Sequence, residues 1–274
     1  MRLELKGSLL LVGAGNMGLA MLAGWIENGL SPAQVIVQDP APPAASQAFL
    51  AKHGIVAQGA VAQLPAPPAV VVMAVKPQIM GEVLPKVAPL VGPETVLLSI
   101  AAGRTIASFE AALPPRSAVV RAMPNTPASI GRGITVCVGN AYMTPAQKSL
   151  CDSLLSAVGA VGWVDEEGDI DAVTAVSGSG PAYVFYLAEC MTAAGVAAGL
   201  SQELSEKLAR WTVAGAGELL HRSDLGADQL RKNVTSPNGT TYAALQVLMA
   251  DDGMKPLLEK AIAAAAKRSQ ELAS

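Results

Sequence analysis

The chain opens on a short apolar run that passes directly into a glycine-rich segment. The run is Leu9–Val12, and Gly13, Gly15 and Gly18 follow it before a helical pattern that ends near Asn28. In such a strand–turn–helix, the first glycine permits the tight turn, the second lets the backbone approach a pyrophosphate, and the third lets helix and strand pack closely. The helix N-terminus then faces the anion. The alternative is an incidental glycine-rich turn, but the flanking strand and helix favour a dinucleotide-binding turn.

The same stretch also has features of a signal peptide or membrane span. Within Leu9–Ile26 the only strongly polar residue is Asn16, and Arg2 and Lys6 precede it. Four glycines weaken a membrane helix, however, and the apolar run Val35–Val37 resumes a βαβ rhythm. We therefore expect a cytoplasmic protein that does not associate with membranes.

The net charge and the small numbers of cysteine and histidine limit the classes of function that the chain can have. The net charge is -3 and the basic residues are scattered, which argues against nucleic acid and favours a small-molecule substrate. The three cysteines lack CxxC spacing, so we expect no disulfide. With only His53 and His221, the chain has little material for a zinc site or a hydrolytic triad, and no metal is expected.

Short apolar runs separated by helix-compatible stretches predict an α/β fold: a Rossmann-type, doubly wound, mostly parallel sheet followed by an all-helical C-terminal domain. The acidic loop Asp165–Asp169 marks the expected boundary, with a dinucleotide-binding domain at 1–164 and a helical substrate and dimerisation domain at 165–274. The expected strands include Val35–Val37, Val70–Val75, Thr95–Ile100, Val119–Val120, Ile134–Val138 and Val161–Val164.

Helical spacing after the acidic loop predicts helices over Asp171–Leu200, Gln202–His221, Thr240–Ala250 and Lys255–Leu272, with 224–238 mostly turn. The long first stretch is rich in alanine and glycine and carries little charge. A monomer would leave its apolar face exposed, so we expect a homo-oligomer.

Residues that follow the strands are candidate ligands, because ligands bind beyond the carboxyl ends of an open parallel sheet. Lys76 could reach a phosphate or ribose, and the small residues 101–103 could let a nicotinamide ring lie against the backbone. Met123–Pro127 follows another strand. Each segment could also be an ordinary turn.

Asp39 lies 21 residues after Gly18 (39 − 18), where an acid bonds the adenosine ribose and repels a 2′-phosphate. No Lys or Arg occurs between Pro40 and Ala51. These residues favour NADH over NADPH, unless Pro40 turns the carboxylate away.

A turn in the second domain leads from Leu230 into a helix near Thr241. Its backbone N–H groups and hydroxyls suit a small carboxylate. The alternative is simple N-capping by Ser236, Thr240 or Thr241.

Taken together, the chain resembles the pyrroline-5-carboxylate reductase family, the last enzymes of proline biosynthesis, over essentially its whole length. The segments that carry the resemblance are Val12–Gly18, Ala74–Pro77, Ser99–Gly103, Arg121–Pro127, Ser177–Tyr183 and Ser236–Thr241. The resemblance implies reduction of the cyclic imine to L-proline by hydride from NADPH or NADH. It also implies an interlocked helical domain at a homodimer interface, often within a larger ring.

Carried over by position, the resemblance implies that Thr241 hydrogen-bonds the ring nitrogen, so that Thr241 is the candidate catalytic residue. Asp224 aligns with an acidic residue near the substrate in some members. The implied substrate contacts are Ser236, Gly239, Thr240, Thr241 and Asp224. The implied cofactor contacts are Gly13, Gly15, Asn16, Met17, Gly18, Asp39, Val75, Lys76, Pro77, Ala101, Ala102 and Asn233.

Two residues depart from the family pattern. Asn238 stands where members commonly have glycine, and Asn tolerates a left-handed backbone better than most residues. Asp39 stands where members frequently have a hydroxyl residue. The sequence leaves open the cofactor preference, the oligomer size beyond a dimer, activity on ring homologues and inhibition by proline.

The implied chemistry needs no strong general acid, because the imine nitrogen can take its proton from water. A 3-hydroxyacid dehydrogenase would need a base, often a lysine on the long helix, and none occurs between Lys148 and Lys207. Another imine reductase on the same plan and a nucleotide-binding module without turnover are the remaining alternatives.

Overall fold

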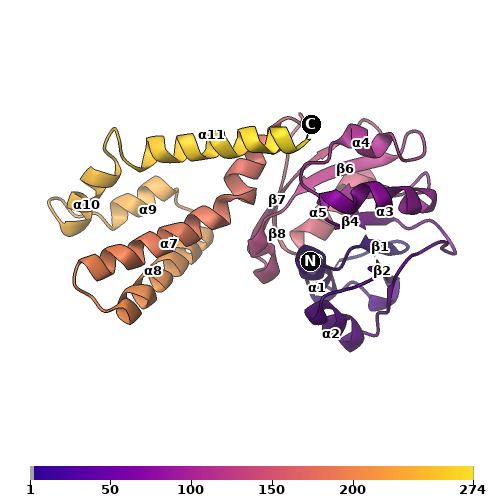
Figure 1. The fold of residues 1–274 in the computed structure, drawn as a ribbon, viewed down its shortest axis with the longest axis horizontal. Helices are drawn as coiled ribbons and strands as arrows, with labels where there is room; N and C mark the ends of the chain where they lie inside the picture. Colours follow the sequence, from indigo (N-terminus) through magenta and orange to yellow (C-terminus); the bar gives the residue numbers. More distant parts are fainter. Residues whose placement is uncertain (1–2, 274) are drawn as a thin grey trace. The chain divides into compact units, whose positions relative to one another are not determined.

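The computed structural model describes residues 3–273, which fold into two compact units (Figure 1). The first unit contains the chain up to Gly178 and the C-terminal stretch from Ala266 onward. The second unit is Ser179–Ala265. No helix among the described residues is long and apolar enough to cross a membrane.

The first unit is built on an eight-stranded sheet of order β3-β2-β1-β4-β5-β6-β7-β8. Every neighbouring pair is parallel except β6 and β7, which are antiparallel. The expected mostly parallel, doubly wound sheet is therefore confirmed. The strands are β1 (Leu9–Val12), β2 (Val35–Gln38), β3 (Ala57–Gln58), β4 (Val70–Met73), β5 (Val96–Ser99), β6 (Ala118–Met123), β7 (Gly133–Gly139) and β8 (Gly159–Trp163).

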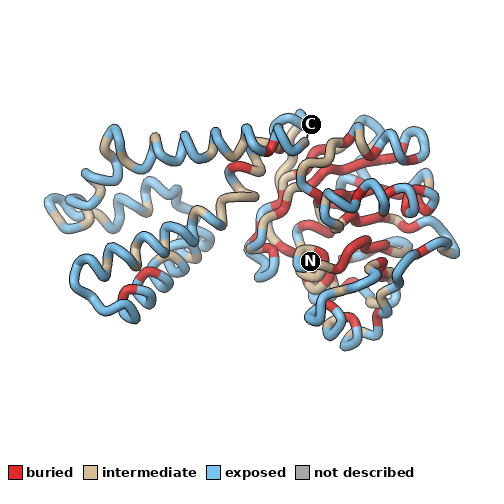
Figure 2. The backbone as a smooth tube through the Cα atoms, in the orientation of Figure 1, coloured by how far each residue is buried: buried red, intermediate tan, exposed pale blue. Residues whose placement is uncertain are grey.

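Helices cover both faces of this sheet, because alternate strand residues point to opposite sides. Leu9 and Leu11 of β1 pack in one cluster with Trp25, while Leu10 and Val12 pack in the other. The central strands are buried throughout, as Figure 2 shows. The helices of this unit are α1 (Asn16–Glu27), α2 (Ala44–Lys52), α3 (Met80–Val87), α4 (Ile106–Glu110), α5 (Pro145–Ser156), α6 (Asp169–Val173) and the π-helical turn η5 (Thr174–Gly178), with short 3₁₀ turns at η1 (Pro32–Gln34), η2 (Pro77–Ile79), η3 (Ala88–Leu90) and η4 (Thr126–Ile130).

The compact units divide at Gly178, while the expected boundary between functional domains at residues 164 and 165 stays a prediction. The acidic loop is tied to the sheet, because Glu167 accepts hydrogen bonds from the buried Arg121 side chain at 2.8 Å and from the Ile106 N–H at 2.9 Å. Ile170 of α6 is buried in the second core cluster. The segment up to Gly178 therefore belongs with the sheet.

The second unit is all-helical, as expected. It contains α7 (Gly180–Ala197), α8 (Gln202–Arg222), α9 (Ala227–Asn233), α10 (Thr240–Leu248) and the first part of α11 (Met254–Ala273). The expectation that 224–238 is mostly turn is wrong at α9. Most of its residues are good helix formers, and Lys232 pairs with Asp228 one helical turn away at 3.1 Å.

Candidate functional site

The glycine turn lies at the end of β1, where the strand order reverses between β1 and β4. Gly13 has φ +95°, and a Cβ there would lie 2.8 Å from the carbonyl oxygen of Ala74. A Cβ on Gly18 would collide with the carbonyl oxygen of Gly13, whereas one on Gly15 would meet no atom within 4 Å. The first and third glycines thus permit the turn and the close packing, and the second faces open space.

The helix that follows begins without a side-chain cap. Asn16 and Met17 open α1 after the N-cap residue Gly15, and no side chain among residues 3–273 accepts a hydrogen bond at this cap. The first N–H groups of a helix carry a partial positive charge. This end of α1, beside the open space at Gly15, therefore fits the diphosphate of a dinucleotide.

Asp39 holds the glycine turn from the side. Its Oδ2 accepts a hydrogen bond from the Ala14 N–H at 2.7 Å, and its Oδ1 accepts one from the Ala41 N–H at 2.9 Å. Ser46 donates its hydroxyl to the carbonyl oxygen of Ala14. Pro40 therefore does not turn the carboxylate away: the half-buried negative charge lies beside the turn.

Two candidate loops follow the neighbouring strands β4 and β5. In the first, Lys76 is exposed while Val75 and Pro77 are half-buried; in the second, Ala101 is buried and Ala102 is exposed. Sequence reasoning missed the residue that joins the two loops. Arg104 donates from Nη2 to the carbonyl oxygen of Pro77 at 3.0 Å. The only sequence signal was the position of this arginine directly after the small residues 101–103.

The segment after β6 is fixed by Asn125. This side chain accepts a hydrogen bond from the Ile134 N–H at 2.9 Å and donates one to the carbonyl oxygen of Ser177 at 3.1 Å. Ser177 belongs to the π-helical turn η5, a type of irregularity that is frequent at functional sites. Asn125 thus connects the end of β6 to the π-helical turn η5.

The second candidate site is the turn before α10. The Gly239 N–H donates to the carbonyl oxygen of Ser236 at 3.1 Å, and Asn238 has φ +58°. Pro237 followed by a left-handed residue defines a type II turn, so Asn238 takes the place of a glycine, as expected. Gly239 itself admits no Cβ, because a Cβ would collide with the Ser236 hydroxyl.

The simple capping alternative for this turn is wrong. Gly239 is the N-cap of α10, and in the described part of the chain no side chain hydrogen-bonds there. Thr241 is half-buried, while Ser236 and Thr240 are exposed. Backbone N–H groups and hydroxyls therefore remain together at the start of a nine-residue helix, an arrangement that suits a small carboxylate.

Two further expected site residues lie in the same unit. Asn233 ends α9 and accepts a hydrogen bond from Gln229 Nε2 at 2.8 Å. Asp224 is exposed in the connection between α8 and α9. Both remain predictions as ligand contacts.

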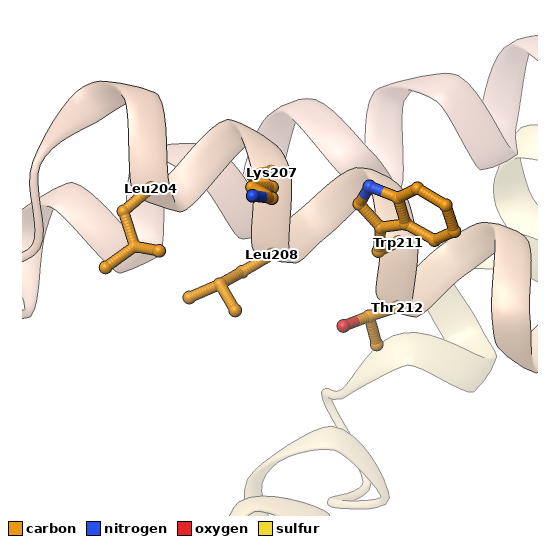
Figure 3. A pocket seen from close by; sticks show the side chains of 5 residues that line it. All are labelled: Leu204, Lys207, Leu208, Trp211 and Thr212. Atoms are coloured by element: carbon orange, nitrogen blue, oxygen red, sulfur yellow. The ribbon is translucent and has the colours of Figure 1, made fainter.

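The second unit buries almost nothing within itself. Its only buried residues are Ser205 and Ala209, whereas Phe185, Trp211 and Val247 are 63%, 70% and 71% exposed. Five residues of α8 line an open groove, and Figure 3 shows Leu204, Leu208 and Thr212 pointing to the same side of the helix; the lining residues are Leu204, Lys207, Leu208, Trp211 and Thr212. Exposed apolar surface on this scale is typical of a protein–protein interface.

The cysteines and acidic residues form no other reactive centre. Burial raises the pKa of both the Cys137 and Cys151 thiols, so neither is a thiolate near neutral pH. All three cysteines are free, including the exposed Cys190. Within residues 3–273 no three His, Cys, Asp or Glu side chains gather in a way that could hold a metal ion.

Two family models each match one part of the chain. Residues 8–103 match the family model described as NADP oxidoreductase coenzyme F420-dependent. Residues 167–272 match pyrroline-5-carboxylate reductase dimerisation. A glycine turn at the switch point of a parallel sheet and a helical self-association unit define the class: a two-domain, dinucleotide-dependent oxidoreductase. The expected homo-oligomer is confirmed at the level of this dimerisation family.

Individual relatives identify the family within that class. A pyrroline-5-carboxylate reductase of Pseudomonas aeruginosa is 44% identical over 96% of this chain and 95% of its own length. The structure of one from Coxiella burnetii has a TM-score of 0.90 at 35% identity and covers 98% of this chain and 99% of that one. A Plasmodium falciparum pyrroline carboxylate reductase with NADP bound has a TM-score of 0.80 at 29% identity over the full length of both. The chain belongs to the pyrroline-5-carboxylate reductase family.

Proposed function

We propose that this chain reduces 1-pyrroline-5-carboxylate to L-proline, using NADPH or NADH, in the cytoplasm. The identity of 44% over 96% of the chain to an enzyme of that name supports the substrate. The glycine turn, with open space at Gly15, is the structural observation that carries the dinucleotide. Three free cysteines agree with a reducing compartment. We propose that the dimer is the basic assembly and that dimers join into a larger ring.

The residues of the first unit fit a nicotinamide dinucleotide, which supplies the hydride when bound. Gly13, Gly15 and the first turn of α1 hold the diphosphate, and Asp39 lies where the adenosine ribose is expected. The loops containing Lys76 and Ala101 follow β4 and β5 and receive the nicotinamide end. The chain's task in this unit is to hold the dinucleotide in one orientation.

The turn before α10 receives the substrate. Backbone N–H groups and the hydroxyls of Ser236 and Thr240 bind its carboxylate, and the hydroxyl of Thr241 orients the ring nitrogen. Since the imine nitrogen takes its proton from water, these residues need only bind and orient. Asp224 and Asn233 are secondary contacts of substrate and cofactor, respectively.

The test is the loss of reduced-nicotinamide absorbance when purified protein is mixed with pyrroline-5-carboxylate and, in parallel, NADH or NADPH. We expect rapid oxidation by the unaltered chain. Thr241→Ala should lower kcat/KM for the imine roughly 100-fold, as loss of an orienting hydrogen bond typically does, while cofactor binding changes by less than about twofold. Thr241→Ser keeps the hydroxyl and serves as the matched control.

Two results would contradict this proposal. Absence of oxidation with either cofactor would rule out the reaction and favour another imine or a binding role. Equal activity of Thr241→Ala and the unaltered chain would remove Thr241 from the mechanism while leaving the reaction intact.

A further inference from the structure

The loops after β4 and β5 belong to separate parts of the chain but lie at the same edge of the sheet. β4 and β5 are parallel neighbours, with Met73 paired to Ser99 at their carboxyl ends. Each loop leads into a different short helical element, η2 at Pro77 and α4 at Ile106. Backbone pairing between the strands therefore stops before the residues expected to meet the nicotinamide end.

Arg104 spans the interval between these loops. Its half-buried guanidinium donates from Nη2 to the carbonyl oxygen of Pro77 at 3.0 Å. A guanidinium bears five N–H donors in a rigid planar fork, and this bond directs one of its two terminal nitrogens at the β4 loop. Because the acceptor is a backbone oxygen at the first residue of η2, the bond holds the course of that loop rather than one side chain.

The other side of the β5 loop is held by the C-terminal end of α11. Gly103 has φ +68°, and a Cβ there would lie 3.0 Å from the carbonyl oxygen of Leu272. This end of α11 is itself anchored, because Ser269 donates its hydroxyl to Asp171 Oδ1 of α6 at 2.6 Å. The loop 101–104 is thus packed against a fixed helix end on one side and bonded to the β4 loop on the other.

We propose that Arg104 is a positioning residue that holds the Ala101–Gly103 loop and the Lys76–Pro77 loop in one arrangement for the nicotinamide end of the dinucleotide. The inference rests on the proposed function, since it assigns these loops to the cofactor. Arg104 acts at this end alone, because the diphosphate and adenosine end is held by the glycine turn and by Asp39.

The experiment compares two ligands by direct titration, NADH and ADP-ribose, which lacks the nicotinamide. Arg104→Met removes the donors but keeps an apolar stem, and should weaken NADH binding roughly fivefold, the effect of one lost hydrogen bond. ADP-ribose binding should stay unchanged, and the melting temperature should stay within about 2 °C. Arg104→Lys restores a donor and should recover part of the NADH affinity.

Arg116→Met is the matched control. Arg116 precedes β6, so it lies toward the opposite edge of the sheet, where its guanidinium is 5.8 Å from the centre of the Tyr142 ring. This variant should bind both ligands as the unaltered chain does. The comparison distinguishes the effect of losing Arg104 on NADH binding from the effect of losing a positive charge elsewhere in the same unit.

Two results of the titrations would overturn the inference, each in a distinct way. Unchanged NADH binding in Arg104→Met would show that the loops do not need this bond, and equal weakening of NADH and ADP-ribose would assign Arg104 a general structural role. Turnover of pyrroline-5-carboxylate is assayed separately. An unaltered chain that binds NADH but leaves the imine unreduced would contradict the proposed function without affecting the Arg104 comparison, whereas one that binds neither nucleotide would overturn both.

Discussion

Asp39 accepts two backbone hydrogen bonds, one from the glycine turn and one from its own turn. Its spacing from Gly18 predicted a charge at this place, but only the folded chain shows that the carboxylate also supports the turn. Asn238 is the opposite case, because its left-handed φ follows from its position in a Pro-Asn turn and could be predicted. The hydrogen bond from Arg104 to Pro77 could not be predicted from the sequence, since it joins loops that are distant in sequence.

The two roles of Asp39 can be separated by substitution. Asp39→Ser removes the charge that opposes a 2′-phosphate, and should raise kcat/KM for NADPH relative to NADH roughly tenfold, equivalent to about 1.4 kcal/mol. Asp39→Asn removes the charge but keeps an oxygen that can accept from the Ala14 N–H, so it should shift the ratio with less loss of stability. The ratio is measured by steady-state kinetics with both cofactors. An unchanged ratio in both variants would mean that the carboxylate does not face the ribose.

At the scale of elements, the buried parallel strands were the most predictable part, because a strand covered on both faces is apolar along its length. The direction of β7 relative to β6 was not predicted. The connection Pro124–Arg132 is too short for a crossover, so β7 runs antiparallel to β6. The short helix α9 was missed because turn residues flank it on both sides. No local sequence pattern indicates that α11 returns to the first unit, since its end is held there by contacts distant in sequence.

The anchoring of α11 gives a prediction about stability. Ser269 is buried and donates to Asp171 at 2.6 Å, so Ser269→Ala should lower the free energy of unfolding by about 1 kcal/mol. Urea denaturation at one fixed protein concentration measures this change. Ser153→Ala is the control, because that exposed hydroxyl bonds only to the carbonyl oxygen of Ser149 one turn earlier on α5. Equal stability of the two variants would show that the Ser269 bond contributes nothing net.

At the scale of the whole molecule, the two units differ in how they bury apolar surface. The first has two core clusters against the sheet, while the second leaves large apolar side chains in contact with water. We expect such a unit to gain stability from association, in agreement with its match to a dimerisation family. The alanine- and glycine-rich sequence predicted this association but did not identify the contact residues.

Substitution of Trp211 tests that association most directly. It is the largest exposed side chain of the groove on α8, and buried tryptophans often dominate interfaces. Trp211→Asp should raise the dissociation constant of the oligomer roughly 30-fold, corresponding to about 2 kcal/mol. Sedimentation over a range of concentrations measures it. Tyr142→Asp places the same charge at an exposed aromatic of the first unit and should leave association unchanged; an equal effect of the two variants would contradict the assignment.

Local sequence patterns predicted the glycine turn after the first strand, the parallel sheet, the helical second unit and the left-handed turn at Asn238. All of these depend on local spacing: glycines where a Cβ cannot fit, apolar runs buried on both faces, and turn residues with restricted φ. Three contacts became visible only in the folded chain: Asp39 supports the glycine turn, Arg104 joins two loops, and α11 returns to the first unit. Those contacts join residues far apart along the chain, so their geometry exists only once the strands and helices have packed.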